Sequence, residues 1–122
     1  MGTSMTVARK FSREISSGTT SLALLAILEQ AEEPMYGYRI AKEMAGEDRE
    51  LRVIKQGALY PVLKSLERSG LLSSRVEPSV SGPPRRYYSI TEDGKAALVR
   101  WSEIWRETSQ LVNRILGGGI DE

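Results

Sequence analysis

The chain has 122 residues, of which 40% are hydrophobic and 27% are charged, and this composition fits one folded domain. It contains neither cysteine nor histidine. Without these residues, a disulfide framework, the common zinc sites, a cysteine nucleophile and a serine–histidine triad are all excluded. We therefore expect no enzyme activity, no cofactor and no metal site.

Charge is spread unevenly along the chain, although the formal net charge is only +1. Residues 29–50 carry seven acidic and three basic side chains, whereas residues 55–86 carry six basic and two acidic ones. A basic segment on a near-neutral protein is typical of nucleic-acid binding. An ordinary solvated surface explains the same segment equally well.

The longest apolar run, residues 22–28, is far shorter than the ~20 residues that span a bilayer. It also lacks the cleavage pattern of a signal peptide. We therefore expect a cytoplasmic protein with no membrane partner.

Hydrophobic spacing predicts an N-terminal arm before the main helices. Val7, Phe11 and Ile15 recur at four-residue steps, which favours a short amphipathic helix over residues 6–17. The sequence SGTTS at residues 17–21 then predicts a break with candidate capping residues.

Three helices are expected after this break. Residues 22–30 are apolar on nearly every side and predict a buried helix. A second helix is expected at residues 36–45, closed by Gly46 and the acidic sequence EDRE, and a third at residues 55–69. Gly70 follows the third helix, as is typical of a helix C-terminus.

The hydrophobic period changes from 3.6 to 2 after Gly70. Residues 71–77 and 85–91 alternate apolar with polar side chains and predict two strands. The proline- and glycine-rich sequence PSVSGPP between them predicts the loop of a hairpin. Thr91 is a suitable N-cap for a last helix, which we expect to run to about Leu116, before GGG.

The last helix carries an apolar face that is longer than a small core can cover. Its members recur at steps of three and four, which predicts a partner helix, most simply from a second copy of the chain. The expected dimerisation residues are Leu98, Trp101, Ile104, Trp105, Thr108, Leu111, Val112 and Ile115.

This order of elements predicts a mainly α fold with a small β-hairpin, an α+β winged helix-turn-helix followed by a long C-terminal dimerisation helix. The expected division has an N-terminal arm or short helix at residues 1–18 and a winged helix-turn-helix DNA-binding domain at residues 19–91. The C-terminal dimerisation helix follows at residues 92–117, and a tail at residues 118–122.

In a winged helix-turn-helix the third helix enters the major groove and the wing lies against the backbone or the minor groove. Lys55 can neutralise a phosphate, Gln56 can read a base edge, and Gly57 permits close backbone approach. The candidate DNA-binding residues, which also draw on the second helix and the wing, are Tyr38, Lys42, Lys55, Gln56, Gly57, Tyr60, Lys64, Arg85 and Arg86.

Structural explanations compete with some of these roles. Gly57 also fits a simple turn at the start of a helix. Tyr60 is equally suited to half-buried packing and to a phosphate contact. Arg85 and Arg86 form either a solvated pair or, at the wing tip, a phosphate contact.

Three linked motifs resemble one known family. YGYRIAKEM at residues 36–44, GALYPVLKSLERSGLLSS at 57–74 and SGPPRRYYSITEDGKAAL at 81–98 are similar to the PadR family of bacterial transcriptional regulators. The resemblance implies a homodimeric winged-helix repressor that binds a palindromic operator in double-stranded DNA and is released by a small ligand. The single long C-terminal helix resembles the short group of this family.

In the short group, the resemblance implies that the last helix packs across the dimer and helps to form an apolar ligand pocket. Trp101 and Trp105 lie one turn apart and are candidates to line it, with a small aromatic or planar apolar molecule as effector. Packing of the dimer core is the competing explanation for both residues.

Two other functions are compatible with parts of this sequence. A winged helix can bind protein without binding DNA, although the Lys55, Gln56 and Lys64 side chains favour DNA. An enzyme that uses carboxylates alone would need paired acids such as Glu92 and Asp93. These two are better explained as charges that stabilise the start of a helix.

Overall fold

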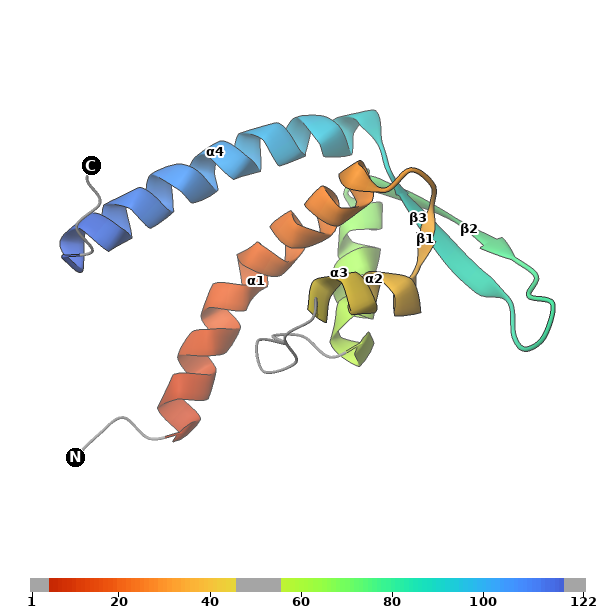
Figure 1. The fold of residues 1–122 in the computed structure, drawn as a ribbon, viewed down its shortest axis with the longest axis horizontal. Helices are drawn as coiled ribbons and strands as arrows, with labels where there is room; N and C mark the ends of the chain where they lie inside the picture. Colours follow the sequence, from red (N-terminus) through yellow and green to blue (C-terminus); the bar gives the residue numbers. More distant parts are fainter. Residues whose placement is uncertain (1–4, 46–55, 118–122) are drawn as a thin grey trace.

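The computed structural model describes residues 5–45 and 56–117 of the chain (Figure 1). Four helices and three short strands follow one another in this part. Their order is α1 (Met5–Gln30), β1 (Met35–Tyr36), α2 (Gly37–Ala45), α3 (Gln56–Arg68), β2 (Leu72–Glu77), β3 (Arg85–Ile90) and α4 (Glu92–Ile115). The mainly α fold with a small sheet and the winged-helix order are thereby confirmed.

The strands form an antiparallel sheet in the order β1-β3-β2. β2 and β3 make the predicted hairpin, with Leu72 opposite Ile90 and Glu77 opposite Arg85. A third strand was not predicted: the two residues of β1 pair with β3 at Tyr87 and Tyr88. A two-residue strand has no period to detect, so only the partner strand identifies it.

One hydrophobic core joins the winged-helix elements. Leu24, Leu25 and Ile40 are fully buried, and Leu63 from α3 and Tyr88 from β3 complete the centre. α1, α2 and α3 each contribute apolar side chains, and the three strands add Met35, Leu72 and Tyr88. Burial of such side chains is worth roughly 1.5–3 kcal/mol each, so this cluster fixes the positions of α3 and the wing.

The predicted helix break at residues 17–21 is wrong, because α1 continues through it. The Ser16 hydroxyl donates to the Ser12 carbonyl at 2.8 Å, and the Thr19 hydroxyl donates to the Ile15 carbonyl at 3.0 Å. These side chains bond back to their own helix instead of capping a new one. Thr20, which is 4% exposed, lies at the start of the part of α1 that packs on the core.

The turn after α3 has the predicted glycine. Gly70 has φ 83°, and its amide donates to the Glu67 carbonyl at 2.9 Å. The Leu71 amide donates to the Leu66 carbonyl at 3.0 Å. This paired arrangement satisfies the last carbonyls of α3 and turns the chain into β2.

The start of α4 is fastened to this turn. Thr91 is its N-cap, since the hydroxyl accepts from the Gly94 amide at 3.0 Å, as the sequence predicted. The same hydroxyl donates to the Gly70 carbonyl at 2.7 Å. Gly94 is buried, and a Cβ there would lie 2.2 Å from the Leu71 carbonyl oxygen. Glycine is therefore required where the first turn of α4 meets the backbone after α3.

Beyond this joint, α1 and α4 diverge (Figure 1). We call residues 6–19 of α1, and residues 102–115 of α4 with its C-cap Leu116, the helical arms. Large apolar side chains are exposed along both of them: Val7, Phe11, Ile15, Ile104, Trp105, Leu111, Val112, Ile115 and Leu116. Within the described ranges, no helix combines the length and apolar character needed to cross a membrane.

Candidate nucleic-acid interface

A concave surface lies between the wing, β1 and the starts of α2 and α3. We call it the wing groove. It is lined by Tyr36, Gly37, Tyr38, Tyr60, Ser79, Ser81, Pro83, Pro84, Arg85 and Arg86. Four of the predicted DNA-binding residues, from three separate elements, thus line one surface.

A row of aromatic rings and cations crosses the groove from the wing to α2. The Arg85 guanidinium lies 4.4 Å from the centroid of the Tyr36 ring. Tyr36 stacks on Tyr38 at 6.5 Å and meets Tyr87 edge-on at 5.5 Å. The Lys42 ammonium lies 5.6 Å from the Tyr38 ring, so that cations occupy both ends of the row. Cation–π contacts of this kind hold the charges in place without neutralising them.

Tyr60 is partly packed and partly exposed, so the packing role is supported and the phosphate contact stays a prediction. A Cβ on Gly37 would lie only 2.7 Å from the Tyr60 hydroxyl oxygen, so the phenol packs closely against the start of α2. The side chain is nevertheless 43% exposed. Its position therefore serves packing between α2 and α3 and leaves part of the ring open to the groove.

The two neighbouring arginines of the wing have different partners. Successive side chains of a strand point to opposite faces. Arg85 lies against Tyr36, whereas Arg86 donates from Nη1 to the Ser74 hydroxyl at 2.9 Å. Ser74 in turn donates to Glu67 Oε2 at 2.7 Å. The hydrogen-bonded chain links the wing to the last turn of α3.

Tyr88 is opposite Ser74 in the sheet, and its side chain is only 2% exposed. Burial raises the pKa of its phenol above the usual value, while the positive charge of Arg86 opposes the rise and the negative charge of Glu67 adds to it. The phenol therefore stays neutral at physiological pH and acts as a core residue.

The other predicted DNA-binding residues lie on α3 or directly before it. Lys64 is exposed on α3 and does not line the wing groove. Gln56 and Gly57 lie in the first turn of α3. Lys55 lies outside the described residues, as do Gly46 and EDRE, the predicted end of α2.

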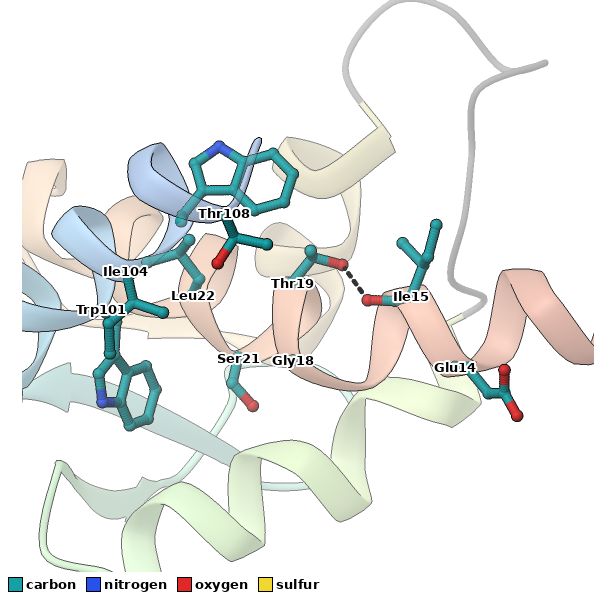
Figure 2. A pocket seen from close by; sticks show the side chains of 10 residues that line it. Glu14, Ile15, Gly18, Thr19, Ser21, Leu22, Trp101, Ile104 and Thr108 are labelled. Carbon is teal, nitrogen blue, oxygen red and sulfur yellow. Dashed lines mark hydrogen bonds between the residues drawn. The ribbon is translucent and has the colours of Figure 1, made fainter. Parts of the chain in front are cut away.

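A second groove lies between α1 and α4, and we call it the arm groove (Figure 2). Both predicted pocket residues line it: Trp101 is half-buried against the core, and Trp105 is 48% exposed. The lining residues are Glu14, Ile15, Gly18, Thr19, Ser21, Leu22, Trp101, Ile104, Trp105 and Thr108. Glu14 is the only charged residue among them, and in Figure 2 it lies at the end of the groove away from Trp101.

The expected dimerisation residues divide into two sets. Leu98 and Trp101, near the start of α4, pack partly on the core of their own chain. Ile104, Trp105, Thr108, Leu111, Val112 and Ile115 are exposed.

Comparison with known proteins identifies the family. The sequence model of the transcriptional regulator PadR-like family matches residues 24–100, which is more than half of the chain. The chain belongs to this family. The chain is therefore a DNA-binding regulator of transcription.

Relatives and solved structures agree with the family. An uncharacterised protein of Lysinibacillus sphaericus is 31% identical over 98 residues, covering 80% of this chain and 87% of that protein. A transcriptional regulator of Mycobacterium tuberculosis is 42% identical over 65 residues, covering 53% of this chain and 57% of that protein.

Two solved structures extend the similarity over most of the fold. A transcriptional regulator from Clostridium thermocellum has a TM-score of 0.73 at 30% identity, covering 83% of this chain and 96% of that chain. A PadR-like transcriptional regulator from Bacillus cereus has a TM-score of 0.69 at 27% identity, covering 87% and 99%.

Sequence reasoning missed three residues that hold the wing arginines in place: Tyr36 contacts Arg85, Ser74 accepts from Arg86, and Glu67 accepts from Ser74. Tyr36 belongs to the first motif, YGYRIAKEM. It lies between Arg85 of β3 and Tyr38 of α2 because it is part of strand β1, which the sequence did not predict. Aligning the two strands of the hairpin would have placed Ser74 opposite Tyr88, on the face that also carries Arg86.

Proposed function

We propose that this PadR-like protein is a homodimeric repressor that binds a palindromic operator and responds to a small planar, apolar effector. The observation that supports it most is the row of exposed apolar side chains on the two helical arms, beside a winged helix with its own complete core. Large contiguous apolar surfaces are rare on monomers and mark sites of association.

The proposed DNA face is the wing groove together with the start of α3. Arg85, Arg86 and Lys42 supply positive charge there, and Tyr38, which is 52% exposed, supplies a hydroxyl. Such groups bind phosphates and fix the register of a protein on the duplex. The full proposed set is Tyr38, Lys42, Lys55, Gln56, Gly57, Tyr60, Lys64, Arg85 and Arg86.

The proposed dimer pairs the arms of two chains. On α1, the exposed fractions of Phe11 and Ile15 are 61% and 50%. On α4, those of Val112 and Ile115 are 46% and 74%. A second copy carries the same apolar rows, so one symmetric contact would cover both sets. Two winged helices would then address half-sites about one helical turn, ~34 Å, apart.

The proposed effector site is the arm groove. Trp101 and Trp105 offer two indole rings, and Ile104 and Leu22 add apolar surface. Flat aromatic molecules stack on such rings. Because the groove lies between the two arms, a ligand there would alter the angle between them and hence the spacing of the two DNA faces.

A mobility-shift assay tests the proposed function. The probe is the DNA immediately upstream of the protein's own coding sequence, with a mixed-sequence duplex of equal length as control, across a series of salt concentrations. We expect tighter binding to the upstream probe and a steep loss of affinity with salt. Equal and weak binding to both probes by folded protein would instead favour a protein partner for the winged helix.

A further inference from the structure

Arg86 is held differently from its neighbour Arg85, although both line the wing groove. The Arg85 guanidinium lies over the Tyr36 ring, 4.4 Å from its centroid. Arg86 instead donates one hydrogen bond to the Ser74 hydroxyl. A guanidinium has five N–H donors, so four of those on Arg86 remain for another acceptor. The exposed side chain is thus oriented and still able to bind.

Glu67 sets the direction of the Ser74 hydroxyl that accepts from Arg86. The Ser74 hydroxyl has a single proton, which it gives to Glu67 Oε2 at 2.7 Å. Its lone pairs are then directed toward Arg86 Nη1, 2.9 Å away. A hydroxyl that donates to a carboxylate is also a stronger acceptor, so the two bonds reinforce each other.

The position of Glu67 supports a role beyond helix stability. It lies in the last turn of α3, which ends at Arg68. A negative charge at this end is disfavoured by the helix dipole. No ion pair to Glu67 forms within residues 5–45 and 56–117, so its contact with the wing runs through Ser74.

We propose that Ser74 and Glu67 are positioning residues that present Arg86 to a DNA phosphate, while Arg85 joins the wing to β1. The proposal rests on the proposed DNA-binding function. It assigns unequal roles to two adjacent arginines and makes the last turn of α3, through Ser74, part of the wing's contact with the duplex.

The test uses two substitutions of nearly equal shape, Ser74→Thr and Ser74→Val. Both side chains are β-branched and suit a strand, but only threonine keeps the hydroxyl. Each is made in the wild-type, Arg86→Ala and Arg85→Ala chains, and circular dichroism checks that these six proteins and their three parent proteins fold. Affinity for a mixed-sequence duplex is then measured by fluorescence anisotropy at several salt concentrations.

We expect Ser74→Val to bind about fivefold more weakly than Ser74→Thr in the wild-type chain. The difference should persist in Arg85→Ala and disappear in Arg86→Ala, because only Arg86 depends on the hydroxyl. Arg86→Ala itself should reduce the salt slope by about one phosphate contact.

A structural role for Ser74 alone would give a different pattern. The valine variant would then bind more weakly than the threonine variant by the same factor in all three chains, and this result would overturn the positioning role. Equal affinities of the two variants in the wild-type chain would also overturn it. If folded wild-type protein bound no duplex at low salt, the proposed DNA-binding function itself would fail.

Discussion

The winged helix and the helical arms differ in how far their apolar side chains are buried within one chain. In the winged helix, Leu24, Ile40 and Leu63 are completely buried within one chain. On the arms, Phe11 and Ile115 remain 61% and 74% exposed. The first region is closed by its own elements, whereas the second has apolar faces that the single chain leaves open.

This difference shows that one helix can serve two purposes along its length. The end of α1 packs on the core through Leu24 and Leu28, and its start carries the exposed Phe11. α4 reverses the order, with Leu98 packed on the core and Val112 exposed. The arms that a partner would cover are therefore joined by continuous helix to the core that positions the wing.

Breaking the arm contact should have the largest effect. We expect Val112→Glu to weaken dimerisation at least about 100-fold, because two unpaired carboxylates would be buried in a symmetric contact. Sedimentation equilibrium measures this change. Val99→Glu is the matched control, since Val99 is exposed on the same helix but outside the predicted dimerisation face. Equal dissociation constants for the two variants would show that the exposed row on α4 is not the interface.

Breaking the joint between the two regions should come next. We expect Gly94→Ala to lower the free energy of unfolding by about 3 kcal/mol, because its Cβ would meet the Leu71 carbonyl at 2.2 Å. Gly70→Ala has open space and suffers only from φ 83°, so it should cost about 1 kcal/mol. Urea denaturation compares the variants, and equal losses would mean that close packing at Gly94 does not fasten α4.

The response of stability to alkali tests the burial of the Tyr88 phenol in the core. Burial raises the pKa of Tyr88, so above about pH 10 the unfolded chain loses the phenol proton before the folded chain does. The free energy of unfolding should therefore fall with rising pH more steeply in the wild type than in Tyr88→Phe. Urea denaturation from pH 9 to 11 measures both slopes. Parallel slopes would contradict the buried state of this phenol.

The smallest expected effect concerns the arm groove. Planar aromatic compounds should quench tryptophan emission, and replacing exposed Trp105 by Phe should reduce the response more than replacing half-buried Trp101.

Glu14 should favour a cationic compound over a neutral analogue of the same shape by about threefold, and Glu14→Gln should remove this preference. An unchanged preference in Glu14→Gln would place the ligand elsewhere.

Local sequence signals predicted most of the element boundaries. The C-terminal glycine of α3 at Gly70, the Thr91 cap and the end of α4 before the glycines are set by short-range backbone chemistry. The hairpin followed from the change of period after Gly70. These features depend on neighbours in the chain, so one sequence is enough to find them.

The errors share a different cause. The serine and threonine residues of SGTTS are ambiguous, because their hydroxyls can cap a new helix or bond back to the existing one, as Thr19 does. β1, the close approach at Gly94 and the link from Glu67 through Ser74 to Arg86 all depend on which segments meet in three dimensions. Spacing along a single chain does not contain that information.

The molar mass in solution shows whether a second copy of the chain covers the helical arms. Multi-angle light scattering at micromolar protein should give twice the chain mass of 13.6 kDa. A mass of 13.6 kDa for the folded wild-type chain would rule out the proposed dimer, since the apolar rows on α1 and α4 would then be stable in water without a partner copy.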